Sequence, residues 1–308
     1  MINRELIRLK VVQLVYAYYQ NEGKTQDVAE KELHFSLQKA YELYKYLLNT
    51  LVEIRRYAER RVEGSRHRAQ LMKSGGADIA DVRLAENKLL LMLEDNKALA
   101  DYRETKSDWE EEPMLIKSLY NAFVESEAFK EYLDGGENSF ESERRIICVL
   151  YKKLIAENEE LDDVLEVHSL YWNDDRHVVD TFVMKTLKRF AETTSPEQPL
   201  LPDYDSERDR EFAVTLFRET ILRADETRRY IADNCKNWEY SRLAMMDVVI
   251  MQIALTEMLV FPEIPATVTI SEYLDLARVY STPRSPGYIN GLLDHILKAM
   301  REEGILMK

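Results

Sequence analysis

Residues 243–260, "LAMMDVVIMQIALTEMLV", decide the fold class of this chain. The stretch is apolar almost all round and is interrupted by Asp247, Gln252 and Glu257. A helix with apolar side chains on every side is normally the buried centre of a bundle. The stretch is too short and too interrupted to span a membrane, which takes about 20 predominantly apolar residues. It therefore predicts a helix that other helices surround.

Helical periodicity extends over most of the remaining chain. Apolar residues recur at three- and four-residue steps through residues 4–20 and through a very long segment that ends at "KSGG" (73–76). Only 9 Gly and 8 Pro are present, which favours long helices, and "ATVTI" (266–270) is the one short strand candidate. Further helices are expected at 79–101, 114–124, three between 139 and 193, and then 207–222, 225–237, 241–260, 270–280 and 286–303. The sequence predicts an all-α protein built as a helical bundle.

A proline-rich stretch marks the main boundary. Residues 193–206, "TTSPEQPLLPDYDS", hold three prolines and are typical of a linker or crossover. We expect an N-terminal helical subdomain at 1–60, an additional helical region at 61–200 and a C-terminal helical subdomain at 201–308. The last of these has the most regular apolar pattern.

The composition limits the classes of function. With a net charge of -14, the chain as a whole would be repelled by phosphates, although a local basic site remains possible. Cys148 and Cys235 are far apart in apolar helical patterns, so they are expected to be small buried residues and not zinc ligands. The start of the chain lacks a long apolar signal segment. We expect a cytoplasmic, reduced protein.

Nothing in the sequence indicates an enzyme. GxSxG, Walker-type and GxGxxG motifs are absent, and the five histidines are scattered without triad or metal-ligand spacing. Carboxylate runs such as "ENEELDD" (157–163) are typical of solvated helix faces. No cofactor and no metal are expected.

Two basic features contrast with the acidic background. Arg4, Arg8 and Lys10 lie at the start of the first helix, where Arg4 and Arg8 share a face. Residues 55–73 contain Arg55, Arg56, Arg60, Arg61, Arg66, His67, Arg68 and Lys73. The second feature is either a solvated helix end, stabilised by the helix dipole, or a contact surface for RNA.

A polar pair raises a separate question near the C-terminus. In "YSTPRSPGYINGLLDHIL" (280–297), Asn290 and Gly291 lie in the first turns of a helix that otherwise favours Leu and Ile. Either these positions are incidental, or the helix backbone there must approach another molecule closely.

The two ends of the chain resemble the NusB family of bacterial transcription antitermination factors. The resemblance lies in "RELIRLKVVQLVYAYYQ" (4–20), in 243–282 with "IP" at 264–265 and "ISEYLDLA" at 270–277, and in "SPGYINGLLD" (285–294). It implies an all-helical fold of two subdomains. It also implies a non-enzymatic protein that binds boxA-type RNA together with the ribosomal protein NusE, and thereby modifies RNA polymerase, notably on ribosomal RNA operons.

The resemblance also implies site residues. The RNA-binding set comprises Arg4, Arg8, Lys10, Tyr280, Arg284, Ser285, Tyr288 and Asn290. Tyr288 would stack on a base, Asn290 would read a base edge, and Ser285 would cap the helix where its free N–H groups favour a phosphate. Tyr16 and Asp247 would face NusE. Glu5, Leu6 and Ile7 interrupt the family's denser N-terminal arginine run, so the 55–73 stretch is a candidate to compensate for it.

Two other readings stay open. The chain is alternatively a helical protein–protein interaction scaffold whose RNA binding is vestigial. An RNA methyltransferase carrying a NusB-like domain is disfavoured, because no glycine-rich cofactor loop or catalytic cysteine motif follows residue 294. The role of region 61–200, the preferred RNA sequence and the oligomeric state are not indicated.

Overall fold

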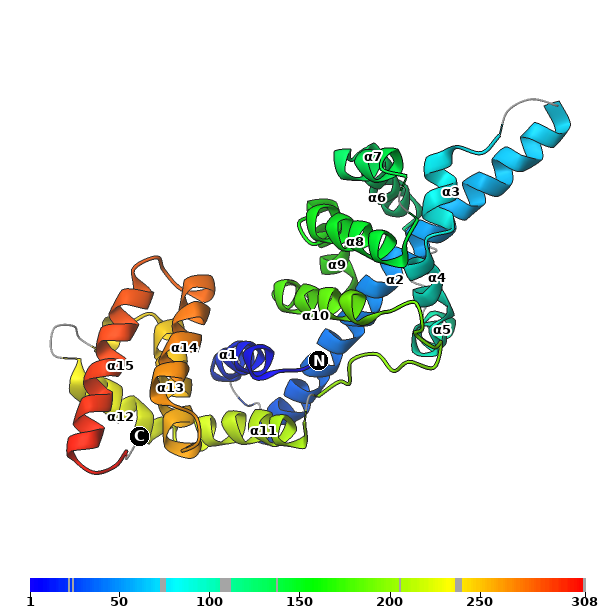
Figure 1. Ribbon diagram of the computed structural model, residues 1–308. Coiled ribbons are helices and arrows are strands. Elements are labelled where there is room, and N and C mark those ends of the chain that lie inside the picture. The colour runs from blue at the N-terminus through cyan, green and yellow to red at the C-terminus, as the bar shows by residue number, and fades with distance from the viewer. Residues whose placement is uncertain are drawn as a thin grey trace. The chain divides into compact units, whose positions relative to one another are not determined.

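The computed structural model describes residues 1–21, 23, 25–72, 76–105, 112–136, 138–204, 206–235 and 240–306. Within these ranges the regular structure is helical, apart from an isolated bridge between Ile2 and Tyr204 (Figure 1). The predicted all-α fold is confirmed. Among the described residues, no helix combines the length and the apolar character that a membrane span requires.

The described helices follow one another along the chain, with the longest connection, residues 190–206, between α10 and α11. Their bounds are α1 (Arg4–Gln20), α2 (Gln26–Met72), α3 (Ile79–Ala85), α4 (Lys88–Asp95), α5 (Lys97–Thr105), α6 (Pro113–Glu125), α7 (Glu127–Asp134), α8 (Phe140–Leu150), α9 (Glu159–His168), α10 (Arg176–Arg189), α11 (Glu207–Leu222), α12 (Ala224–Asn234), α13 (Met245–Val260), α14 (Ala266–Tyr280) and α15 (Ser285–Glu302). A short π-helical segment, η2 (Tyr151–Ile155), follows α8, and a 3-10 segment, η3 (Tyr240–Arg242), precedes α13.

The chain forms two compact units. Unit 1 comprises Met1 and residues 39–203, and unit 2 comprises residues 2–38 and 204–308. Helix α2 contributes its first turns to unit 2 and the remainder to unit 1. The N-terminal helix α1 thus belongs to the same unit as the C-terminal helices.

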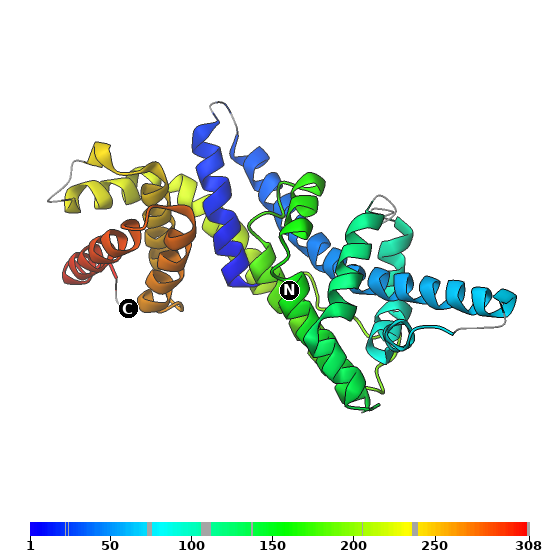
Figure 2. The ribbon, with the colours of Figure 1, turned by 90° about the horizontal axis from the view of Figure 1, so that it is seen from above.

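Unit 1 is built along the larger part of α2. Helices α3–α10 pack around this part, with α8 contacting α4, α7 and α10, and the end of α2 extends beyond them (Figures 1 and 2). A polar cluster joins α8 to α10: the Tyr151 hydroxyl, in the π-helical segment, donates to Asp180 Oδ1 at 2.5 Å. Burial raises the pKa of Asp180 to about 6.

Helix α13 is the centre of unit 2. Every residue from Asp247 to Met258 is buried, and α13 contacts α1, α11, α12, α14 and α15. This confirms the prediction that the apolar stretch is a surrounded helix. Its three polar interruptions are also buried, and each is hydrogen-bonded inside unit 2.

The strand candidate at 266–270 is wrong, because α14 begins at Ala266. Pro265 precedes the first helical residue, where its fixed φ suits a helix start. The Thr269 hydroxyl donates to Glu257 Oε1 at 2.8 Å. A buried tertiary hydrogen bond therefore fixes this β-branched run in a helix despite its strand propensity.

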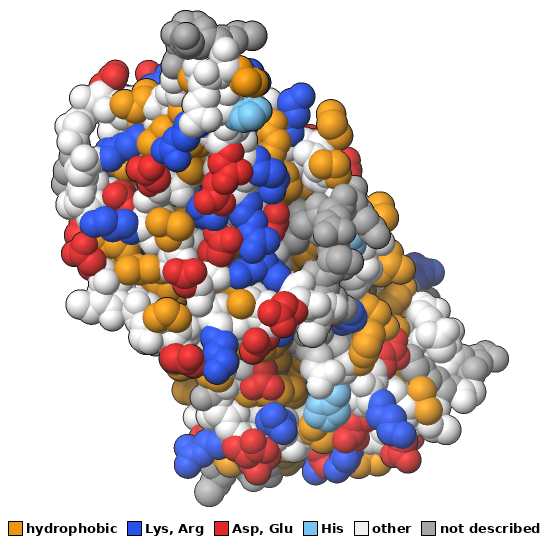
Figure 3. All heavy atoms as spheres, turned by 90° about the vertical axis from the view of Figure 1, so that its right-hand side faces the viewer, with side chains coloured by type: hydrophobic (Ala, Val, Ile, Leu, Met, Phe, Trp, Pro, Cys, Tyr) orange, Lys and Arg blue, Asp and Glu red, His pale blue; other side chains and the backbone are white. Residues whose placement is uncertain are grey.

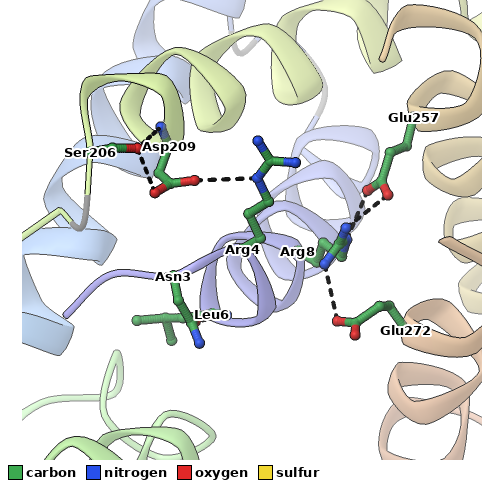
Figure 4. Close-up of polar contacts among 8 residues, drawn as sticks. All are labelled: Asn3, Arg4, Leu6, Arg8, Ser206, Asp209, Glu257 and Glu272. Carbon is green, nitrogen blue, oxygen red and sulfur yellow. Dashed lines mark hydrogen bonds and ion pairs between the residues drawn. The ribbon is translucent and has the colours of Figure 1, made fainter. Parts of the chain in front are cut away.

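A buried ion pair fastens α1 to α13. Arg8 is 4% exposed, and its Nε and Nη2 donate to the two carboxylate oxygens of Glu257 at 2.8 and 2.9 Å (Figure 4). Arg8 Nη1 also donates to Glu272 Oε2 in α14 at 3.0 Å. Burial alone would lower the pKa of Arg8, but the hydrogen bonds and charge of Glu257 outweigh burial and raise it.

The Glu257 carboxylate is saturated with hydrogen bonds. Besides Arg8, it accepts from the hydroxyls of Thr269 and Tyr273, the latter at 3.0 Å. Three helices thus meet at one buried carboxylate. Such a pair becomes costly when one partner is removed, because the remaining charge stays buried.

We therefore expect Arg8→Ala to lower the free energy of unfolding by about 3–5 kcal/mol, since it leaves Glu257 uncompensated. Urea denaturation followed by circular dichroism measures this. Arg4→Ala, one helical turn away, is the control: the Arg4 side chain is 34% exposed, and its ion pair with Asp209 should contribute at most about 1 kcal/mol. Equal effects of the two substitutions would contradict the assignment.

Candidate nucleic-acid interface

The three N-terminal cations have different environments. Arg4 Nε donates to Asp209 Oδ1 at 3.2 Å and its guanidinium lies 4.9 Å from the Phe212 ring centroid, yet a third of the side chain stays exposed (Figure 4). Arg8 is committed to Glu257 and Glu272, and Lys10 is 1% exposed. The expectation that Arg8 and Lys10 contact RNA does not agree with this burial, because neither cation reaches the surface. The resemblance assigned these positions to RNA, whereas the tertiary contacts of α1 bury them.

Ser285 has a different role from the predicted helix cap. It is the first residue of α15, and Arg284, at the N-cap position, makes no side-chain capping bond. The Ser285 hydroxyl donates instead to Asp247 Oδ2 at 2.8 Å, and both residues are buried. The Ser281 hydroxyl also donates to the Asp247 carboxylate and lies 3.0 Å from Ser285 Oγ. Asp247 therefore anchors the start of α15 to the start of α13.

The exposed side of the first turns of α15 is almost bare. Arg284, Gly287, Asn290 and Gly291 are exposed, whereas Ile289 and Leu292 on the opposite side are buried. A Cβ atom added at Gly287 or at Gly291 would meet no atom within 4 Å. Packing within the described chain therefore does not require glycine at either position. A glycine in a helix interior costs roughly 1 kcal/mol relative to alanine. The missing side chains leave the helix backbone here open to a closely approaching molecule.

Two tyrosines border this surface. The Tyr288 hydroxyl lies 3.4 Å from Cys235 Sγ, and burial, followed by the hydrogen bond with Cys235, raises the pKa of Tyr288. Tyr280 ends α14, and its hydroxyl accepts from Gln13 Nε2 at 2.9 Å. Both side chains are half-buried, so each presents part of its ring. Cys235 is likewise half-buried and not part of the core, which the sequence pattern did not indicate.

Tyr16 and Asp247, the two residues expected to face a protein partner, differ in their burial and contacts. Tyr16 is half-buried late in α1, next to a tyrosine pair in which the rings of Tyr18 and Tyr19 lie 5.7 Å apart. Tyr19 accepts from Gln252 Nε2 at 2.6 Å. Asp247 is only 6% exposed and is engaged by the serines of the α15 turn. Its sequence position near the start of α13 gave no signal of this contact, because Ser285 is 38 residues away.

The basic stretch at 55–73 contains arginines that pair with carboxylates and basic residues that are exposed. Lys73 lies outside the described residues. Arg55 pairs with Glu59 and Glu94, Arg56 pairs with Glu53 and Glu94, and Arg61 pairs with Asp81. Arg66 lies 3.8 Å from Glu86. Arg60, His67 and Arg68 are exposed. Much of the charge in this stretch thus holds α2 to α3 and α4.

No group of three or more His, Cys, Asp or Glu side chains arranged to hold a metal occurs in the described part of the chain. The candidate nucleic-acid interface is the start of α15, where Arg284, Gly287, Tyr288, Asn290 and Gly291 lie together. We call it the α15 surface.

The Asp247 anchor has a structural consequence that can be measured without any ligand. Asp247→Ala leaves the Ser281 and Ser285 hydroxyls without their acceptor, at a cost of about 1–3 kcal/mol. We expect faster amide hydrogen exchange at residues 287–291. Asp294→Ala in the same helix removes only an exposed pair with Lys298 and is the control. Unchanged exchange in Asp247→Ala would contradict the anchoring role.

Comparison with known proteins agrees with the resemblance noted above. A sequence profile of the NusB family matches residues 181–298. The transcription antitermination protein NusB of Salinibacter ruber is 36% identical over 132 residues, which cover 41% of this chain and 82% of the relative. That of Geotalea daltonii is 29% identical over 140 residues, covering 45% of this chain and 93% of the relative.

A solved structure of T. maritima NusB is 22% identical, covers 50% of this chain and 90% of its own, and has a TM-score of 0.29. The profile ends within α15, so the α15 surface lies inside the matched region. More than half of the chain has no counterpart in the Salinibacter relative. This chain belongs to the NusB family of transcription antitermination proteins.

Proposed function

We propose that the protein binds boxA-type RNA together with the ribosomal protein NusE and acts in an RNA polymerase antitermination complex, notably on ribosomal RNA operons. Its site of action is then the cytoplasm, and it catalyses no reaction. The observation that carries the proposal is the α15 surface: an exposed arginine, an exposed amide and a half-buried tyrosine around a helix backbone that two glycines leave bare.

The chemistry of this surface suits single-stranded RNA. Tyr288 offers a ring face for base stacking, and Asn290 can donate to and accept from a base edge. Arg284 supplies the positive charge for a phosphate. Gly287 and Gly291 let the sugar–phosphate chain approach the helix closely. Ser285, whose hydroxyl is directed to Asp247, is assigned a positioning role, and Arg8 and Lys10 are left out of the contact set.

Arg4 and Tyr280 extend the proposed RNA contacts. Arg4 keeps a third of its side chain exposed, and Tyr280 is the half-buried residue that ends α14. Tyr16 is the proposed contact for NusE. The net charge of -14 would favour a basic protein partner and would suppress nonspecific RNA binding.

A second candidate function is a protein-interaction scaffold. It is favoured by the size of unit 1, which extends over residues 39–203. If NusE is captured normally while boxA-type RNA does not bind under any condition, this alternative replaces the first.

Fluorescence anisotropy with a boxA-type RNA, with and without NusE, tests the main proposal. We expect Tyr288→Ala to weaken binding by about 1–3 kcal/mol through lost stacking. Tyr288→Phe is the matched control: it keeps the ring, loses the hydroxyl that contacts Cys235, and should bind nearly as the natural protein does. Arg284→Glu should weaken binding and flatten the log–log salt dependence by roughly 0.7. RNA binding that is indifferent to both Tyr288→Ala and Arg284→Glu would refute the assignment of the surface.

Gly291→Ala separates folding from binding. Because a Cβ at this position meets no protein atom within 4 Å, the substitution should stabilise the protein by up to about 1 kcal/mol. The same methyl group should obstruct the RNA, so we expect weaker binding by a more stable protein. Thermal unfolding and anisotropy on the same samples measure both effects. Stabilisation with undiminished affinity would mean that no ligand approaches this backbone.

A further inference from the structure

One face of α2 in unit 1 groups exposed arginines around an aromatic ring and a glycine. Tyr57, Arg60, Gly64 and Arg68 are three or four residues apart and therefore lie on the same side of the helix. Arg60, Gly64 and Arg68 are exposed and Tyr57 is half-buried. The opposite side contains Val62, which is buried. We call the four residues the α2 arginine face.

The arginines of this face contact neutral groups. Arg60 lies over the Tyr57 ring, at 5.9 Å from its centroid, and Arg68 Nη2 donates to Ser65 Oγ at 3.1 Å. By contrast, the neighbouring Arg55, Arg61 and Arg66 each pair with a carboxylate. Among the described residues, the charges of Arg60 and Arg68 are therefore available to an external anion, whereas those of their neighbours are largely neutralised within the unit.

Another arginine contacts α2 at Asn49, which lies before the α2 arginine face in the helix. Arg103 donates to Asn49 Oδ1 and to the main-chain carbonyl of Glu94, and both of these acceptors are neutral. Burial, followed by the nearby charge of Arg56, lowers the pKa of Arg103. The face shown in Figure 3, which looks onto the side where α3, α4 and α5 lie in Figure 1, has a run of Lys and Arg side chains near its middle, bordered by acidic side chains.

Gly64 is the most informative residue of the face. It lies inside a long helix, where glycine costs roughly 1 kcal/mol relative to alanine, yet a Cβ there would meet no atom within 4 Å. Packing within the described chain therefore does not explain why residue 64 is glycine. The helix dipole does not explain Arg60 either, because the dipole favours cations in the last turn, whereas Arg60 lies about three turns before Met72. A backbone open on one side and flanked by arginines fits a closely approaching phosphate chain.

The aromatic ring specifies the kind of polyanion. Tyr57 packs against Tyr120, with ring centroids 4.9 Å apart, and stays half-buried. Arg60 lies over this ring, so a base would stack on the arginine–tyrosine pair while the backbone follows the charge, as in surfaces that bind single strands. We propose that the α2 arginine face binds single-stranded RNA that flanks the boxA-type segment. This inference rests on the RNA-binding function proposed above and assigns a second, sequence-independent RNA surface to unit 1.

Two probes distinguish this inference from the proposed function. The first is a short boxA-type RNA, and the second is a flanking single strand of roughly 16 nucleotides without a boxA-type sequence, close to the upper site size of single-strand binding modules. Both are titrated by anisotropy in a salt series against the full chain with NusE. The short probe tests the α15 surface through Tyr288→Ala, and the flanking probe tests the α2 arginine face.

Arg68→Glu and Arg66→Glu form a matched pair of variants. They change the charge equally and are two residues apart, so they lie on nearly opposite sides of an exposed helix end. We expect Arg68→Glu to weaken binding of the flanking probe about tenfold and to lower the slope of its log–log salt dependence by roughly 0.7. Arg66→Glu should change both the affinity for the flanking probe and its salt dependence far less. Gly64→Ala should also weaken binding while leaving the helix intact.

Three results would overturn the inference. The first is that the flanking probe does not bind the natural protein. The second is that Arg66→Glu weakens its binding as much as Arg68→Glu does, which would indicate only a long-range electrostatic field. The third is that the α2 arginine face binds an acidic polypeptide and does not bind the flanking RNA. That result would make the face a protein-docking surface. If the natural protein does not bind the short probe, the α15 proposal is refuted. Binding of the flanking probe that depends on Arg68 would still establish that the α2 arginine face binds single-stranded RNA.

Discussion

Unit 2 depends on one buried carboxylate. Glu257 lies on the central helix α13, and it binds Arg8 of α1 with both oxygens while accepting hydroxyls from Thr269 and Tyr273 of α14. A buried charge is tolerated only when its partners satisfy it completely. The helix register of α1 and α14 against α13 is therefore fixed by polar geometry as well as by apolar packing. The same arrangement removes Arg8 from the set of side chains that reach the surface.

A second carboxylate on the same helix has a corresponding role ten residues earlier. Asp247 binds the hydroxyls of Ser281 and Ser285 and so fixes where α15 begins. The position of Arg284, Tyr288 and Asn290 follows from that starting point. The buried polar residues of α13 thus determine the shape of a surface to which they contribute little exposed area. In this account, positioning and contact are performed by different residues.

The sequence was sufficient for the fold class and for the central helix. The all-round apolar pattern of 243–260 predicted a surrounded helix, and α13 is buried as expected. The helix at Arg4–Gln20 also begins and ends where its periodicity indicated. The failures have a common cause. The strand candidate at 266–270 was judged from local pattern, and the surface role of Arg8 and Lys10 from the family resemblance. Neither reveals contacts across more than 200 residues of sequence, such as Arg8 with Glu257, which decide how Arg8 is buried.

The site was only partly predictable for the same reason. The "NG" pair raised the question of a close approach, and a Cβ atom added at Gly291 would meet no atom of the described chain within 4 Å. Residue spacing could not reveal that Ser285 binds Asp247, or that the Tyr288 hydroxyl lies near Cys235. Nor could it divide the arginines of α2 into those paired with carboxylates and those left exposed, because partners such as Asp81 and Glu94 lie on the later helices α3 and α4.

The central claim is that RNA lies on the α15 surface. Ultraviolet crosslinking of a boxA-type RNA to the complex with NusE, followed by mass spectrometry of the crosslinked peptides, tests it most directly. The account predicts crosslinks in the peptide that contains Tyr288, and their loss in Tyr288→Ala with NusE still bound. Crosslinks confined to other parts of the chain, with the α15 peptide unmodified, would contradict it.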